Sequence, residues 1–138
     1  MSFAAIANSI RSHFNTEFTQ ARPTVPILWD NVKRSSEASP DQAWVRFSIS
    51  EKEPTIRSFG AQDARRVDTP GIAVVEIFTP VGDGDGLLRE IADTVSSIFN
   101  LRSVDNIQFY ETRLIPMGQE GPFYRGVVLT DYVADVFA

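Results

Sequence analysis

Apolar residues recur every three to four positions in two segments of the chain, and this spacing predicts two amphipathic helices. The first is expected over 3–18, where the apolar stripe consists of Phe3, Ile6, Ala7, Ile10, Phe14 and Phe18. Pro23 prevents a continuation of this helix, because the residue before a proline avoids the helical region. The second helix is expected over about 85–100, where Asp83 or Asp85 at its start would suit both capping and the helix dipole.

Alternation of apolar and polar residues predicts strands. In 43–50 the odd-numbered residues are apolar and face the core, whereas the even-numbered ones, Trp44, Arg46, Ser48 and Ser50, face water or a partner. The run 25–29 contains Pro26 and therefore indicates an edge strand. Residues 72–78 are apolar on both faces except at Glu76, which predicts a central strand covered on both sides.

The end of the chain predicts a hairpin, with strands over 105–115 and 123–133 around a seven-residue turn, 116–122, that contains two Gly and two Pro. The segment 31–42 is polar and is expected to be a long loop. Residues 55–59 alternate after a turn at Glu53 and Pro54, and we expect a second strand that forms a hairpin with 43–50. Because the residues that follow contain Arg65, Arg66 and helix breakers, we predict a projecting arm over about 51–70.

The elements follow one another in the order α-β-β-β-β-α-β-β. Successive strands without intervening helices exclude a doubly wound α/β sheet. The pattern therefore predicts an α+β fold, with two helices packed on one face of a mostly antiparallel sheet of five or six strands. The length of 138 residues indicates a single domain spanning 1–138.

Composition narrows the chemistry. The chain contains no cysteine, which excludes thiolate metal sites, disulfides and cysteine nucleophiles. It contains one histidine, His13, so we expect neither a multi-histidine metal site nor a Ser-His-Asp triad. The net charge is −5, divided between a near-neutral half (+1 over 1–70) and an acidic half (−6 over 71–138). This balance argues against a protein that grips phosphates. No signal peptide or membrane-length apolar run is evident, so a soluble, cytoplasmic product is expected.

The loop 82–86, GDGDG, could belong to a calcium site or to a phosphate site, but the further residues that either site needs are missing. A calcium loop needs further oxygen ligands, yet Leu87 and Leu88 follow. A phosphate cradle needs Lys or Ser/Thr after the glycines, and its two aspartates would repel the anion. We therefore expect a capped strand-to-helix turn, no metal or cofactor, no catalytic residue and no enzymatic activity.

Two features are candidates for subunit contacts. The first is the basic group Arg57, Arg65 and Arg66, whose alternative interpretation is a solvated loop. The second is Trp44, whose alternative is a core position.

Five features carry a resemblance to a known family. They are the segment RPTVPILWDNV after the first helix, the Trp-led strand AWVRFSI, the Arg-Arg element, the unit GIAVVEIFTPVGDGDGLLREIADTVSSIF, and the last hairpin, GPFYRGVVLTDYV. On these features the chain resembles siphophage tail terminator proteins, and more narrowly a phage-related family of small tail proteins. The resemblance spans nearly the whole chain.

The resemblance implies a structural protein of the virion. Tail terminators form a ring, commonly a hexamer, that caps the tail tube when it reaches full length and presents a surface for head–tail joining. The implied partners are further copies of the chain, the tail tube protein and a head-completion or neck protein, and DNA passes through the ring without specific binding. The implied location is the head-proximal end of the tail, and the host cytoplasm during assembly.

Two alternatives stay open. One is a head–tail connector or neck protein, which also forms rings of α+β subunits; capping of filled heads rather than of isolated tails would distinguish it. The other is a small ligand-binding or enzymatic α+β domain, which would need a deep pocket with convergent polar groups.

Overall fold

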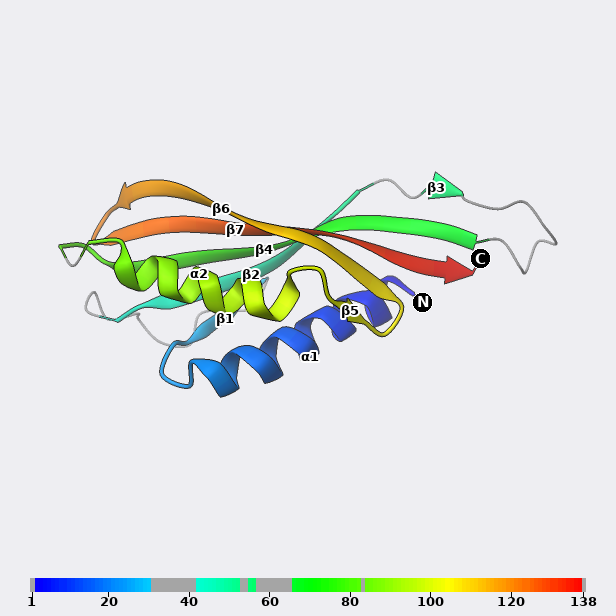
Figure 1. Cartoon of the computed structure of the whole chain (residues 1–138), viewed down its shortest axis with the longest axis horizontal. Helices are drawn as coiled ribbons and strands as arrows, with labels where there is room; N and C mark the ends of the chain where they lie inside the picture. Colours follow the sequence, from blue (N-terminus) through cyan, green and yellow to red (C-terminus); the bar gives the residue numbers. More distant parts are fainter. Residues whose placement is uncertain (1, 31–41, 53–54, 57–65, 83, 138) are drawn as a thin grey trace.

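The protein consists of two layers, a twisted β-sheet and two helices that lie together on one of its faces (Figure 1). The computed structural model describes residues 2–30, 42–52, 55–56, 66–82 and 84–137. The predicted α+β class is confirmed, as is the placement of both helices on one side of a mostly antiparallel sheet. The observed order differs from the predicted one by one additional short strand after the second helix.

Helix α1 (Phe3–Ala21) begins where the sequence predicts and ends three residues later than expected. The Ser2 hydroxyl caps its N-terminus by accepting a hydrogen bond from the Ala5 backbone N–H at 3.1 Å. Its buried face consists of Ile6, Ile10, Phe14 and Phe18, the predicted stripe.

Helix α2 (Gly86–Phe99) buries Leu88, Ile91, Ala92, Val95, Ile98 and Phe99. Asp85 occupies its N-cap position, but the carboxylate makes no capping hydrogen bond. It accepts instead from Arg89 Nε at 2.7 Å, one turn further along. Asp85 therefore stabilises this helix through an i,i+4 ion pair rather than through the predicted cap.

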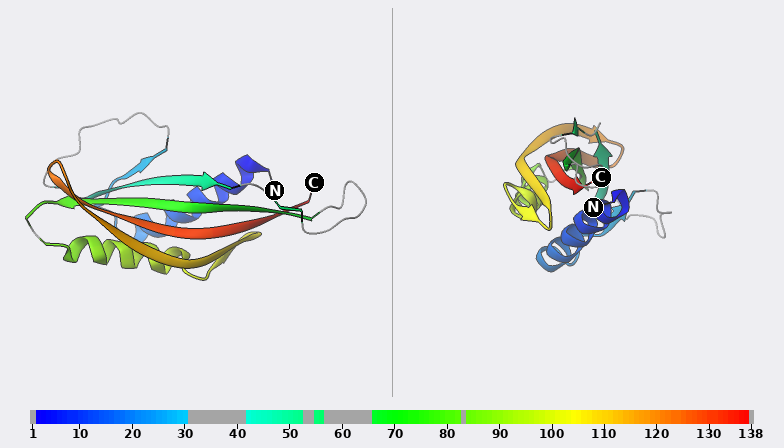
Figure 2. Two further views of the ribbon diagram at one scale, coloured as in Figure 1. Left: turned by 90° about the horizontal axis from the view of Figure 1, so that it is seen from above. Right: turned by 90° about the vertical axis from the view of Figure 1, so that its right-hand side faces the viewer.

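The sheet contains seven strands: β1 (Ile27–Trp29), β2 (Trp44–Glu51), β3 (Thr55–Ile56), β4 (Arg66–Pro80), β5 (Ser103–Val104), β6 (Ile107–Glu120) and β7 (Phe123–Phe137). Six of them lie in the order β1-β2-β4-β7-β6-β5, and β3 pairs with β4. All pairs are antiparallel except β1 with β2. Seen from above, β2, β4, β7 and β6 run side by side with the helices behind them (Figure 2).

Two strand predictions need correction. The strand predicted over 72–78 is the middle of the much longer β4, so that Arg66–Pro70, assigned to the arm, belongs to the sheet. Strand β3 pairs with β4 rather than with β2, as the hairpin prediction required. The remaining arm residues 53–54 and 57–65 and the predicted loop residues 31–41 lie outside the described residues.

The last hairpin is tighter than predicted, because Glu120 pairs with Phe123 across a two-residue turn. The segment 116–120, expected to be a turn, is the end of β6. A bulge between Pro116 and Gly118 accommodates it, and Gly118 adopts the left-handed φ of 87° that glycine tolerates without strain.

One core joins both helices to the inner face of the sheet. Phe14 of α1 is stacked against Phe47 of β2 at 4.8 Å between ring centroids and against Phe99 of α2 at 5.8 Å. Helix α1 thus packs against β1 and β2 through Phe14 and also contacts β5, whereas α2 contacts β4, β6 and β7. In the part of the chain that the structure describes, no helix is long and apolar enough to cross a membrane.

Tyr132 and Gly71 are register partners between β7 and β4, and the tyrosine ring lies directly over the glycine. A Cβ atom at position 71 would come within 2.7 Å of Tyr132 Cε2, closer than real Cβ contacts. Glycine is therefore required here by the close approach of a side chain rather than by its φ angle. Burial raises the pKa of Tyr132 to about 12.

Candidate functional site

The face of the sheet that points away from the two helices has no covering helix among the described elements (Figures 1 and 2). We call it the outer face. Its central residues alternate along four strands with those that face the helices. They are Trp44, Arg46, Ser48 and Ser50 of β2, Ile72, Val74, Glu76 and Phe78 of β4, Arg125, Val127, Leu129 and Asp131 of β7, and Arg113 and Ile115 of β6. On the outer side of β4 no described helix lies, and Ile72, Val74 and Glu76 are half-buried there, so the covering of this side stays a prediction.

One end of the outer face carries a four-residue ion-pair network. Glu76 accepts hydrogen bonds from Arg46 Nε at 3.1 Å and Nη2 at 2.8 Å. The Nη2 of Arg125 lies 2.9 Å from Glu76 Oε2, and its Nη1 lies 3.2 Å from Glu120 Oε2. Partial burial by itself raises the pKa of Glu76, but the hydrogen bonds and charges of the two guanidiniums outweigh it and the pKa is lowered. Glu76 is therefore ionised at neutral pH and held in a fixed geometry.

Aromatic rings lie beneath this network. Trp44 stacks on Phe78 with ring centroids 4.0 Å apart and planes within 5° of parallel, and Phe123 meets Trp44 edge-on at 5.9 Å. The guanidinium carbons of Arg46 and Arg125 lie 5.6 and 5.9 Å from the Phe78 ring centroid. Both arginines thus combine carboxylate pairing with a cation–π contact.

This packing limits how much of Trp44, a predicted contact residue, is accessible to a partner. Its side chain faces outward as the alternation predicted, yet only 6% of the residue is exposed because neighbouring rings cover it. Arg46 is more accessible, with 45% of its side chain exposed. The accessible part of this cluster is therefore the arginine layer, and Trp44 supports it from below.

The other end of the outer face carries a second ion-pair cluster around Asp131. Arg113 Nη1 lies 3.3 Å from Asp131 Oδ2, and Lys52 Nζ lies 3.8 Å from Asp131 Oδ1. Between the two clusters run half-buried apolar side chains, and Val74 pairs in register with Leu129. The outer face is therefore an apolar band between two clusters of paired charges, of which the second has two cations on one carboxylate.

Of the three arginines predicted to make subunit contacts, the structure describes only Arg66. Arg66 is the first residue of β4 and its backbone pairs with Phe137. Arg57 and Arg65 lie outside the described residues. Their assignment to subunit contacts, together with that of Arg66, stays a prediction.

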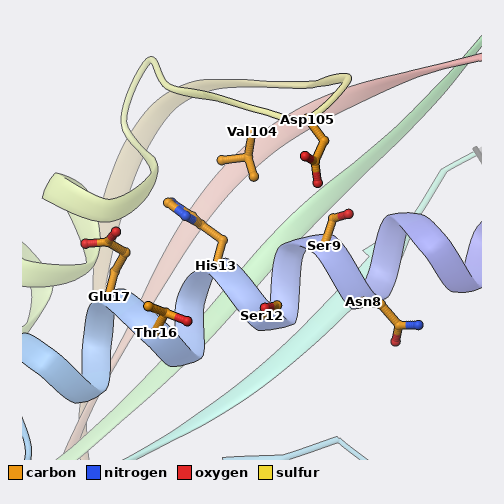
Figure 3. A pocket seen from close by; sticks show the side chains of 8 residues that line it. All are labelled: Asn8, Ser9, Ser12, His13, Thr16, Glu17, Val104 and Asp105. Atoms are coloured by element: carbon orange, nitrogen blue, oxygen red, sulfur yellow. The ribbon is translucent and has the colours of Figure 1, made fainter.

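A shallow groove lies between α1 and the turn after β5 and has a volume of about 440 Å³ (Figure 3). Figure 3 shows the His13 side chain directed from α1 toward Val104. His13 Nε2 lies 3.0 Å from the Ile98 carbonyl oxygen, which can only accept, so this nitrogen donates. Among the described residues no hydrogen bond joins His13 to Ser9 or Ser12, and the groove therefore contains no activated hydroxyl of the kind used in nucleophilic catalysis. His13 instead ties α1 to the C-terminal turn of α2.

The Gly/Asp turn gives no sign of a ligand site in the part of the chain described here. Asp85 is engaged with Arg89, whose hydrogen bond lowers the pKa of the aspartate. In the described ranges, no group of three or more histidine, aspartate or glutamate side chains is arranged to hold a metal ion. Asp83 lies outside those ranges.

Sequence patterns did not reveal the ion-pair clusters of the outer face. The sole signal was Glu76, a carboxylate within an otherwise apolar strand. Its partners come from β2 and β7, 30 and 49 positions away, and only the strand register identifies them.

Comparisons with known proteins bear on the fold alone. No family model matches the chain, and no curated protein does. Matches to solved structures number 14 chains. One of these, which bears no functional name, superposes with a TM-score of 0.74 at 17% sequence identity, over 100% of this chain and 99% of its own. A likeness at this identity supports the α+β fold, and the function has to be argued from the outer face.

Proposed function

We propose that this chain is a structural, non-enzymatic virion protein that assembles into a ring, a hexamer, and caps a phage tail tube. The ring ends tube polymerisation and provides the surface for head–tail joining. The family resemblance of the sequence suggests this role. The observation that carries it is the outer face, a helix-free sheet surface with half-buried apolar residues, which is typical of proteins that complete their packing by association.

The geometry favours an assembly role over a catalytic one. The groove beside His13 is open and its histidine is engaged in a structural hydrogen bond. A ligand-binding domain would instead need an enclosed apolar pocket with convergent polar groups. The outer face is the more extensive surface, and it combines an apolar centre with charged margins as protein interfaces do.

A ring that lets DNA pass should not bind phosphate. The cations of the outer face, Lys52, Arg46, Arg113 and Arg125, are each paired with a carboxylate of the same chain. Neutralised cations release few counterions on meeting DNA, which weakens non-specific binding. This pairing supports the proposal that DNA passes through without being held.

The experiment is to add the purified chain to growing tail tubes of its own phage and to examine the products by negative-stain electron microscopy. The proposal predicts rings at one end of each tube and an end to elongation. Tubes that continue to grow with bare ends would refute it. Attachment to filled heads, with no effect on isolated tails, would identify the chain as a neck protein instead.

A further inference from the structure

We propose that copies of this chain join by extending the sheet, with strand β1 of one copy added antiparallel to the open edge of β6 in the next. This inference rests on the proposed function and deepens it, because it names the two edges on which the copies meet. The strand order places β1 at one edge of the sheet and β6, with the short β5, at the other (Figure 2). A contact between two different edges is heterologous, and such contacts form a ring when the rotation between copies closes.

The outer edge of β6 is closed over its first part and open beyond it. Strand β5 pairs with Ile107 and Gln108, and Asn100 Oδ1 accepts from the Thr112 N–H at 2.8 Å. The Thr112 N–H thus points away from β7, and because backbone groups alternate along a strand, those of Leu114 point the same way. No described strand pairs with this edge beyond Thr112, so the N–H and C=O of Leu114 are left for a partner.

Helix α2 leaves room beside this edge. A groove of about 280 Å³ lies between the helix and the strand, and its lining includes Asp93 and Ser96 of α2 and Thr112 and Leu114 of β6. The helix side of an added strand can therefore be accommodated at Leu114.

Strand β1 has an open edge as well. The Pro26 carbonyl accepts from the Val45 N–H at 3.0 Å and therefore points toward β2. By alternation the backbone groups of Leu28 also point toward β2, whereas those of Ile27 and Trp29 point away from it. No described strand pairs with that outer edge. Two residues of β1 are thus able to pair with another chain.

The strand directions make this joint antiparallel. Strand β1 is parallel to β2, and β2, β4, β7 and β6 are successively antiparallel, so β6 runs opposite to β1. A rotation that continues the sheet from one copy into the next keeps these directions. The faces agree too, because Leu114, Ile27 and Trp29, whose backbone groups point outward, all pack against the core on the helix side.

Side-chain chemistry selects one register of the joint. That register combines a backbone-paired couple, an apolar couple and a couple of opposite charge, which are Leu114 with Trp29, Ile115 with Leu28, and Arg113 with Asp30. A shift of two residues one way would place Arg113 opposite Leu28, and a shift the other way would place Asp30 opposite Ile115. Both shifts set a charge against an apolar side chain.

Arg113 has capacity for a second carboxylate. It meets Asp131 through one contact at 3.3 Å and shares that carboxylate with Lys52, and 49% of its side chain is exposed. Glu111, two residues earlier, forms no ion pair among the described residues. Asp68 is on the same face of the sheet but lies six residues along β4 from the row of Arg113, a distance of roughly 20 Å.

Asp30 is the corresponding carboxylate at the other edge. It directly follows β1, is exposed and forms no ion pair in the part of the chain described here. The pKa of Arg46 is raised chiefly by its hydrogen bond to Glu76, and the charge of Asp30 also contributes. Because Arg46 faces outward on β2 beside Leu28, Asp30 lies near the outer face, as Arg113 does.

The absence of cysteine allows the joint to be tested with pairs of introduced thiols. In the proposed register Ile115 and Leu28 form a pair without backbone hydrogen bonds, whose Cα atoms lie about 4.5 Å apart, within the range of a disulfide. Within one chain they are four strand spacings apart, roughly 19 Å, so this disulfide can form only between copies. We expect the Leu28→Cys/Ile115→Cys variant, oxidised in the assembled fraction, to give a ladder of cross-linked species on a non-reducing gel.

Two further thiol pairs are the controls. Leu28→Cys with Arg113→Cys tests the shifted register, and Leu28→Cys with Leu101→Cys places the second thiol at an exposed residue outside the joint. We expect at least tenfold less cross-linking from both. Equal cross-linking of all three variants, or none in the first, would refute the joint. Preferential cross-linking of position 113 would refute the register and with it the ion pair.

An exchange of charges tests the ion pair itself. Arg113→Asp and Asp30→Arg should each raise the concentration required for half-assembly at least tenfold, because each places like charges opposite each other, and the double variant should restore it to within threefold. Glu90→Arg, on the exposed side of α2, is the control and should change it less than twofold. A double variant that assembles no better than the single ones would refute the pair, and circular dichroism at low concentration verifies folding.

The outcomes separate this inference from the proposed function. Rings on tail tubes in which positions 28 and 115 do not cross-link would contradict the joint and leave the ring standing. Cross-linked chains that leave tubes uncapped would contradict the capping role and leave the joint standing. Monomers under all conditions, with tubes left uncapped, would contradict both.

Discussion

The replacement Glu76→Gln tests whether the outer face is held in place by its ion pairs. Glutamine keeps the shape of the side chain but removes the charge that pairs with Arg46 and Arg125. The Glu76 side chain is only 14% exposed, and three contacts below 3.2 Å join it to the two guanidiniums. It is thus better shielded from solvent than a typical surface pair.

The magnitude follows from this burial. Exposed ion pairs contribute about 0.2–1 kcal/mol, and hydrogen bonds to charged groups about 1.5–3 kcal/mol. Because the two arginines are themselves partly exposed, we expect the Glu76→Gln variant to lose roughly 1–2 kcal/mol of unfolding free energy at pH 7. For a chain of this length that corresponds to a Tm lower by about 3–8 °C.

Glu120→Gln is the matched control. Glu120 meets Arg125 through one contact at 3.2 Å, and its side chain is 63% exposed. Its replacement should cost less than about 0.5 kcal/mol. Urea denaturation of the wild type and both variants measures the difference, and equal stabilities of the two variants would refute the argument.

The pH dependence provides a second readout with a definite sign. The folded-state pKa of Glu76 is lowered, so its contribution is present above the unfolded pKa of about 4.3 and is lost as the pH falls through the folded value. The stability gap between the wild type and the Glu76→Gln variant should therefore be largest near neutral pH and close below pH 4. A gap that is constant down to pH 3 would show that the effect does not arise from the charge of Glu76.

Three further predictions concern other parts of the chain. Gly71→Ala should lower the free energy of unfolding, measured by urea denaturation, by about 1–2 kcal/mol, because the new methyl group overlaps the Tyr132 ring. Tyr132→Phe should lower it by less than about 0.5 kcal/mol, since the buried hydroxyl has no hydrogen-bond partner among the described residues. A larger loss for Tyr132→Phe than for Gly71→Ala would contradict this description of the packing. Leu101→Asn should raise the unfolding free energy by about 0.5–1 kcal/mol, because Leu101 is exposed and has a left-handed φ of 55° that asparagine tolerates better, and a loss of stability would show that its side chain makes a necessary contact. The double change Arg65→Glu and Arg66→Glu should abolish ring formation at physiological salt without lowering the Tm of the monomer, and intact rings in light scattering would remove the arm from the subunit contact.

Periodicity was sufficient to predict the helices and the central strand, because both depend on which residues face the core. It failed at the 116–122 segment, where Pro and Gly predict a turn by local rules. In the folded chain Pro116 lies on an edge strand and Gly118 in a bulge, so neither residue ends the strand. The tertiary position of a strand, which local sequence does not specify, decides the outcome here.

The candidate site was less predictable for a related reason. Alternation placed Trp44 and Arg46 on the outer side of β2, as the structure has them. It gave no information on the ring that stacks on Trp44 or on the carboxylate that pairs with Arg46, since both belong to β4 and depend on its register. The sequence thus indicated a polar face, and only the pairing of strands shows it to be an apolar band between two clusters of paired charges.

The mass of the assembled protein tests the central claim most directly. Multi-angle light scattering of the purified chain, alone and after release from tail tubes, should give a particle of about 92 kDa, six times the 15.4 kDa of one chain. Ile115 is 42% exposed on the outer face, and its replacement by Asp should shift that particle toward the monomer. The matched control Leu101→Asp, at a leucine that is 62% exposed outside that face, should not. A wild-type protein that measures 15.4 kDa in both preparations, with tubes left uncapped, would contradict the account.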